Sequence, residues 1–133
     1  MKIVCDTNVL VSGIVFGGNC RTILQMISTG RLNACMSATL LAELDDVLRR
    51  PKFGLVSQEV AATLELVQHT FDWVSPSEKL FVVADDPDDN AVLEAAVEYR
   101  AQKIVSGDDH LLALKSFRGI PILSPAAFLS SLC

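Results

Sequence analysis

The chain has 133 residues, half of them hydrophobic and 6% aromatic, and its net charge at pH 7 is −5. This length is ordinarily one domain with a sizeable core, so we expect a single domain over residues 1–133. No apolar run approaches the roughly 18 residues of a membrane span. The acidic balance argues against a protein that grips duplex DNA nonspecifically, because such proteins are usually basic. Either nucleic acid is not the ligand, or the carboxylates form a site whose bound cations attract the nucleic acid.

The first predicted element is a short strand at residues 3–5, whose apolar run suits a strand buried on both faces of a parallel sheet. Asp6, Thr7 and Asn8 follow at once and present a carboxylate, a hydroxyl and an amide together. In open α/β sheets, ligand sites lie beyond the carboxyl ends of the strands. A carboxylate at this position on a rigid element is therefore a candidate for chemistry.

Helices and strands alternate along the remaining chain. In order, we predict a loop or short broken helix at residues 12–19, a helix at 21–29, a strand at 32–36, a helix at 38–50 capped by Ser37, a helix from a Ser57 cap to residue 69 or 70, short extended pieces between 71 and 83, a helix at 86–100, a strand at 103–106, a helical turn at 110–115, a strand at 119–123 and a closing helix from Pro125. This alternation predicts an α/β fold of three layers, α/β/α, with a central parallel sheet of four to five strands.

The four cysteines lack the close spacing of zinc or redox motifs. We interpret Cys5 and Cys35 as buried small hydrophobic residues, with a disulfide framework as the alternative. Because the amino terminus also lacks a secretory signal pattern, we expect a protein of the reducing cytoplasm.

Acidic residues occur at four places in this pattern: Asp6, Glu43, residues 86–89 and residues 108–109. Each has an ordinary explanation. Asp86 followed by Pro87 is a typical helix start, residues 108–109 suit a turn that caps a helix, and Glu43 suits an exposed helix position.

Periodicity weakens these explanations for two acids. Asp89 lies on the same helix face as three apolar side chains, Val92, Ala96 and Tyr99, and an inward acid is costly unless it is paired or binds a cation. Glu43 borders the apolar stripe of its own helix. Asp45 borders the other edge of that stripe, so the pattern does not exclude it.

Four converging carboxylates would need positive charge to hold them together. Two like charges about 4 Å apart repel by roughly 4 kcal/mol at an effective dielectric near 20. Divalent Mg²⁺ or Mn²⁺ prefer oxygen ligands and can promote phosphodiester hydrolysis. The sequence contains no Ser-His-Asp order, P-loop or Gly-rich dinucleotide motif that would compete with this interpretation.

Several runs of the sequence resemble a known family. The runs VCDTNVL at 4–10, LLAEL at 40–44, DPDDN at 86–90 and SGD at 106–108 resemble a PIN domain. The runs RRPKF at 49–53, HLLAL at 110–114 and GIPILSP at 119–125 resemble its prokaryotic, VapC-like branch, which is assigned as the toxins of toxin–antitoxin pairs. The match covers nearly the whole chain.

The resemblance implies a PIN-like fold and a Mg²⁺- or Mn²⁺-dependent ribonuclease. By position, the family's acids, which serve catalysis and metal binding, match Asp6, Glu43, Asp89 and Asp108, and its polar supports match Asn8 and Ser106. Family members often carry a further acid two positions beyond Asp108, where this chain has His110. His110 is thus a candidate phosphate contact or a cap of the turn.

Our leading hypothesis is an endoribonuclease that cleaves RNA phosphodiester bonds as the toxin of a toxin–antitoxin pair. Asp6 and Asp89 would chiefly bind the metal, while Glu43 and Asp108 complete the cage and orient the attacking water. The alternative is a catalytically inactive PIN-fold module whose acidic pocket receives a basic segment of a protein partner, such as an antitoxin. A DNA nuclease of related fold is a third reading, but the sequence shows no DNA-gripping region.

Two further expectations concern RNA contacts and assembly. The only dense basic run holds Arg49, Arg50 and Lys52, which would either contact RNA or form a solvated helix end. The resemblance also implies a homodimer, although composition does not locate its interface.

Overall fold

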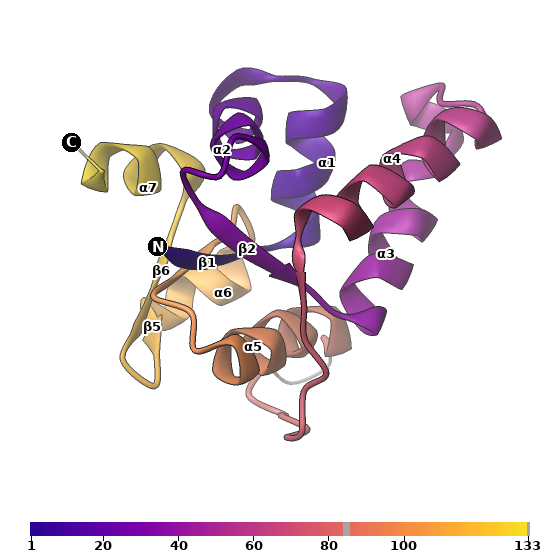
Figure 1. Ribbon diagram of the computed structural model, residues 1–133. Helices are drawn as coiled ribbons and strands as arrows, with labels where there is room; N and C mark the ends of the chain where they lie inside the picture. Colours follow the sequence, from indigo (N-terminus) through magenta and orange to yellow (C-terminus); the bar gives the residue numbers. More distant parts are fainter. Residues whose placement is uncertain (84–85, 133) are drawn as a thin grey trace.

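The computed structural model describes residues 1–83 and 86–132 (Figure 1). Its six-stranded sheet has the order β3-β2-β1-β4-β6-β5. The strands are β1 Lys2–Cys5, β2 Asn33–Met36, β3 Asp72–Trp73, β4 Lys103–Val105, β5 Ser116–Phe117 and β6 Ile120–Leu123. All neighbouring pairs are parallel except β5 with β6. The predicted α/β fold class is confirmed, with one more strand than the sequence led us to expect.

Seven α-helices accompany the sheet in the described part of the chain, together with a short 3-10 helix, Pro51–Phe53. They are α1 Thr7–Val15, α2 Gly18–Ser28, α3 Ala38–Leu48, α4 Ser57–Thr70, α5 Pro87–Tyr99, α6 Asp109–Leu114 and α7 Pro125–Ser131. Figure 1 shows α1, α2 and α7 on one side of the sheet and α5 and α6 on the other. Helix α3 packs against α1, α4 and α5 at the side of the sheet.

The centre of the sheet is buried on both faces, as its sequence predicts. Ile3 and Val4 of β1 and Ile104 of β4 are completely buried. Cys5 and Cys35 are also buried, and the three described cysteines form no disulfide, as expected; Cys133 lies outside the described residues. These central apolar strands between two helical layers stabilise the fold, because their buried side chains are removed from water on both faces.

The antiparallel strand β5 was missed at the sequence level. It forms a hairpin with β6 through Arg118 and Gly119, whose φ angles are +49° and +80°. Two consecutive residues with positive φ are the mark of the tight turn that suits a two-residue hairpin loop. Arg118 is an uncommon residue for that conformation, so the sequence carried a weak turn signal.

Two local predictions about helix starts need correction. Ser12 and Gly13 lie inside α1, which begins at Thr7, and the chain breaks only at Phe16 and Gly17. Ser57 is the first residue of α4 instead of its cap. Ser37 does cap α3, where its hydroxyl accepts a hydrogen bond from the Leu40 N–H at 3.3 Å.

Gly13 lies where α1 contacts α2, and the contact leaves no room for a side chain. A Cβ at this position would lie 2.6 Å from Leu24 Cδ1 and 2.9 Å from the Cys20 carbonyl oxygen of α2. The missing side chain therefore lets the two helices approach closely.

In the described residues, no single helix is long and apolar enough to cross a membrane; α1 and α2 pass that test only as a pair bent by 98°.

We predict that Gly13→Ala destabilises the fold. The added methyl group meets the backbone of α2, which cannot move as a side chain can, so the free energy of unfolding should fall by about 1–3 kcal/mol. Urea denaturation measures this loss. Gly107→Ala is the matched control, because a Cβ there meets nothing within 4 Å; equal stability of the two variants would contradict the close-packing explanation.

Candidate metal centre

The site begins where two central strands end side by side. Cys5 of β1 pairs in register with Val105 of β4, so Asp6 and Ser106, the next residue of each strand, are neighbours. Both are buried, and the Ser106 hydroxyl donates a hydrogen bond to Asp6 Oδ2 at 2.8 Å. The same hydroxyl accepts one from the Asp108 N–H at 2.9 Å. Ser106 therefore links Asp6 to the turn that carries Asp108; its support of metal ligands stays a prediction.

Asp108 is held in place as the cap of α6. Its Oδ1 accepts hydrogen bonds from the His110 N–H at 2.8 Å and the Leu111 N–H at 3.3 Å. The anticipated capping explanation is thus correct. It does not exclude a role in the site, because these bonds involve one carboxylate oxygen and fix the orientation of the whole group.

The start of α5 supplies the opposite wall of the site. Asp86 caps this helix and accepts a hydrogen bond from the Asp89 N–H at 3.2 Å. Asn90 ties the preceding loop to the helix, because its amide donates to the Val83 carbonyl and accepts from the Val83 N–H, both at 2.9 Å. Asp89 itself faces inward, as its periodicity predicted, and is only 4% exposed.

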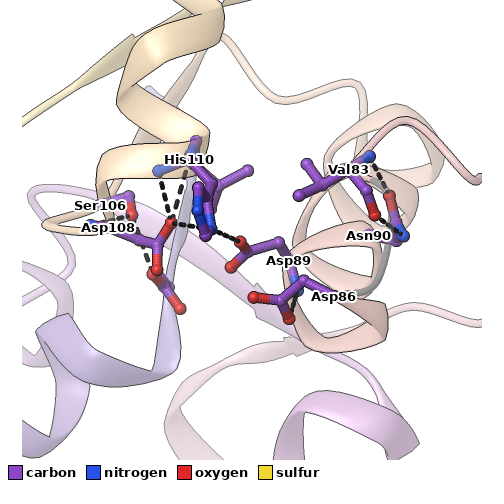
Figure 2. Close-up of polar contacts among 9 residues, drawn as sticks. Val83, Asp86, Asp89, Asn90, Ser106, Asp108 and His110 are labelled. Atoms are coloured by element: carbon purple, nitrogen blue, oxygen red, sulfur yellow. Dashed lines mark hydrogen bonds and ion pairs between the residues drawn. The ribbon is translucent and has the colours of Figure 1, made fainter.

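Acids from α5 and the edge of α6 converge with one histidine. Asp86, Asp89, Asp108 and His110 each offer a potential ligand atom, and these atoms all lie within 4.8 Å of one another. His110 Nδ1 is 3.9 Å from Asp89 Oδ2 and 3.8 Å from Asp108 Oδ1. Figure 2 shows the carboxylates of Asp86 and Asp89 pointing toward Asp108 and His110. We refer to these four residues as the metal cluster.

Glu43 approaches this acidic region from α3 and is not part of the metal cluster. It is half-buried, and with Asp88 it lines an open hollow between α3 and α5. Burial, followed by the charge of Asp88, raises the pKa of Glu43 to about 7, and the Thr7 hydroxyl partly offsets this rise. The charges of Asp6 and Asp86 add to it. Glu43 thus lies within the electrostatic field of the site.

Burial also shifts the acids nearest the strands. It raises the pKa of Asp89 to about 8, with further increases from contact with Asp86 and from the charge of Asp108. It raises the pKa of Asp6 as well, against the hydrogen bond from Ser106, which favours the ionised form. Physically, each carboxylate resists ionising because water is excluded and its neighbours carry the same charge.

Two buried oxygens in this region lack partners. Among the described residues, Asp89 Oδ2 and Glu43 Oε2 are the buried side-chain atoms without a hydrogen bond. A buried oxygen without a partner is costly, and a divalent cation would supply both a partner and the missing positive charge. The donor set suits such an ion, because carboxylate oxygens are the ligands that Mg²⁺ and Mn²⁺ prefer.

Other predicted site residues lie apart from the metal cluster. Arg49 Nε bonds to Asp45 Oδ1 at 2.5 Å, which also gives Asp45 a role away from the site. Arg50 pairs with Asp46 at 3.8 Å, and Lys52 lies over the Phe53 ring. This basic end of α3 is six residues beyond Glu43, about 9 Å along the helix axis. Its contact with RNA stays a prediction.

Sequence reasoning overlooked or misplaced three groups. Asp86 was interpreted only as a cap, although the DPDDN run already placed it one helical turn from Asp89. Asn8 is exposed, and its backbone N–H favours the ionised form of Asp6; the supporting role expected of its side chain stays a prediction. Thr7 is buried beside Glu43 and acts through its hydroxyl; its signal was its place in the run after β1.

A comparison with protein families decides the identity of this arrangement. A family model described as PIN domain matches residues 2–110. The chain belongs to the PIN domain family. No curated protein matches the chain with statistical significance.

Solved structures share this PIN domain fold at low sequence identity. The VapBC2 structure from Rickettsia felis, bound to a DNA fragment from its promoter, matches with a TM-score of 0.64 and 15% identity, covering 93% of this chain and 98% of that one. PAE2754 from Pyrobaculum aerophilum matches with a TM-score of 0.62 and 16% identity over 98% of this chain and 88% of that one. The PIN domain endonuclease Utp24 matches with a TM-score of 0.52 and 17% identity over 92% and 84%. These identities establish a common fold and nothing finer.

We predict that Ser106→Ala weakens divalent-cation binding by this PIN domain about 10- to 100-fold, because Asp6 and the Asp108 turn lose their shared support. Calorimetric titration with Mn²⁺ measures the change. Ser106→Thr, which keeps the hydroxyl, should recover part of the affinity, and an unchanged affinity in Ser106→Ala would contradict the positioning role.

The raised pKa of Asp89 predicts how stability depends on pH. The folded chain retains the Asp89 proton up to about pH 8, whereas an unfolded chain loses it near pH 4. The folded state therefore binds more protons between these values, and the free energy of unfolding should fall as the pH rises through that window.

Asp89→Asn removes the titrating group, so without metal its free energy of unfolding should exceed that of the wild type at pH 8, by on the order of 2 kcal/mol, and approach it near pH 4. Urea denaturation across this range measures the difference. Asp46→Asn changes an exposed carboxylate and should leave the pH profile unaltered. A wild-type stability that rises between pH 5 and 8 more steeply than that of Asp89→Asn would refute the prediction.

Proposed function

We propose that this PIN domain is a metal-dependent endoribonuclease. The observation that carries the proposal is the buried Asp89 oxygen that has no hydrogen-bond partner and lies among three further potential ligands beyond the ends of the central strands. Such an arrangement costs stability unless a proton neutralises the carboxylate or a cation balances its charge. The PIN domain family and the endonuclease among its structural neighbours support a nuclease reading.

Asp86, Asp89 and Asp108 are the carboxylates that would hold the cation, Mg²⁺ or Mn²⁺. When bound, the ion would supply positive charge to the phosphodiester oxygens during hydrolysis. Asp6 and Glu43 complete the acidic field from β1 and α3. Burial raises the pKa of Glu43 to about 7. Glu43 can therefore both gain and lose a proton near neutral pH, close to the metal cluster.

Ser106 acts on this site as a positioning residue. The Ser106 hydroxyl donates a hydrogen bond to one oxygen of Asp6, and the Ser106 hydroxyl oxygen accepts a hydrogen bond from the Asp108 backbone N–H. Asp6 and Asp108 thus keep a constant separation, although they are 102 positions apart in the sequence. A rigid constellation of this kind allows the site to meet a phosphate without reorganisation.

RNA is the proposed substrate, and a toxin of a toxin–antitoxin pair is the proposed setting. The net charge of −5 is unfavourable for nonspecific capture of duplex DNA. The VapBC2 neighbour from Rickettsia felis supports an antitoxin as partner. We further propose that the protein works in the cytoplasm as a homodimer, and that the basic residues Arg49, Arg50 and Lys52 contact RNA outside the metal cluster.

The proposal predicts that Asp6→Asn and Asp89→Asn each reduce Mn²⁺-dependent cleavage of RNA at least about 100-fold. Asparagine keeps an oxygen that can accept the Ser106 hydrogen bond, so the Asp6→Asn variant should retain the fold. Gel assays with a labelled RNA measure the rates, and circular dichroism verifies folding. Asp46→Asn, on an exposed carboxylate of α3, is the control and should cleave normally. Full activity in either site variant would remove the proposal.

An inactive PIN-fold module that binds a protein partner is the alternative. The raised pKa values around Asp89 also suit a pocket that receives an arginine or lysine of a partner. Calorimetry separates the two functions: a nuclease should bind Mn²⁺ with heat that disappears in Asp89→Asn, whereas a protein-binding module should show no such site-specific heat.

A further inference from the structure

The metal cluster contains one group that the acid-based proposal leaves without a role. His110 is the second residue of α6, its side chain is 72% exposed, and its Nδ1 faces two carboxylates. Its backbone N–H already completes the cap of α6 by donating to Asp108. The capping function predicted for this position therefore needs only the backbone, and the imidazole is available for another role.

Distances within the metal cluster fit a shared ion. Two ligands bound to one divalent ion at about 2.1 Å cannot be more than about 4.2 Å apart. His110 Nδ1 meets this limit with Asp89 Oδ2, at 3.9 Å. It lies 3.8 Å from Asp108 Oδ1, which already accepts two backbone hydrogen bonds, so the other oxygen of this carboxylate is the one left for an ion. The widest separation in the cluster is within 4.8 Å, so a shift of less than about 1 Å brings every donor within range.

Asp89 provides the independent sign that something binds here. Its side chain is almost completely buried, and the oxygen that lacks a hydrogen bond is the one that faces His110. At 3.9 Å the two atoms are too far apart for a good hydrogen bond. An ion between them would bind both at their normal bond lengths.

We propose that His110 supplies a nitrogen ligand to the cation held by Asp86, Asp89 and Asp108, and that the site therefore prefers a first-row transition-metal ion to Mg²⁺. This inference rests on the proposed metal-dependent function and adds the identity of the ion. Imidazole binds Co²⁺, Ni²⁺ and Zn²⁺ well, whereas Mg²⁺ selects oxygen donors and keeps its waters. A neutral ring also adds a ligand without adding a fourth negative charge.

A direct test detects nitrogen bound to the ion. Pulsed electron paramagnetic resonance of Mn²⁺ in the full-length, untagged chain should show coupling to a nitrogen nucleus. The chain has only two histidines, and His69 is exposed on α4 beside Glu65. His69→Gln should therefore keep the coupling, and His110→Gln should lose it.

Ion preference gives the second measurement. Calorimetric titration with Co²⁺ and with Mg²⁺ gives the ratio of their affinities in each chain. We expect His110→Asp, which replaces nitrogen by oxygen, to lower the Co²⁺ to Mg²⁺ ratio about tenfold or more relative to wild type, and His69→Gln to leave it unchanged.

The outcomes separate this inference from the proposed function. Mn²⁺ binding that depends on Asp89 but shows no nitrogen coupling in the wild type, or a coupling that survives His110→Gln, would overturn the role of His110 and leave the carboxylate site intact. An absence of Mn²⁺ binding by the wild-type chain would overturn both. Loss of the coupling in His110→Gln alone would establish the ligand.

Discussion

The parallel pairing of β1 with β4 is the constraint on which the site depends. Because Cys5 lies opposite Val105, the next residues, Asp6 and Ser106, come together where the strands end, and Ser106 then bonds to both Asp6 and the Asp108 turn. A shift of register by one residue would separate these groups and turn the buried side chains of the strands to the wrong face. The apolar core that fixes the register therefore also fixes the acids.

The buried carboxylates of this site lower the stability of the fold but are available to bind a cation. Burial raises the pKa of Asp89 to about 8 and that of Glu43 to about 7, so their ionised forms weaken the fold. The surrounding hydrophobic core offsets that cost, and a bound cation would relieve it. Strained, poorly satisfied groups of this kind are expected at sites that bind or react. The two buried oxygens without partners belong to these same two residues.

Several residues serve local structure and the site together. Asp86 caps α5 and Asp108 caps α6, and both also face the metal cluster. Capping explains why an acid stands at each helix start, yet it leaves part of each carboxylate available. In His110 the two roles belong to different parts of the residue: its backbone N–H completes a cap, and its ring lies beside Asp89. An ordinary structural reading and a functional one are therefore compatible at these positions.

The sequence by itself determined the order of elements, the α/β class and the inward face of Asp89, because these follow from the spacing of apolar residues along the chain. It also supplied the PIN domain resemblance, which the family comparison confirms. It could not reveal the β5 strand, the helical course of α1 through Gly13, or that His110 and Asp86 lie with Asp89 and Asp108 while Glu43 reaches the same acidic region from α3. Those features depend on how α5, α6 and α3 pack around the ends of the strands, and contacts between distant segments leave no periodic signal in a single chain. Only the tertiary structure decided which acids meet.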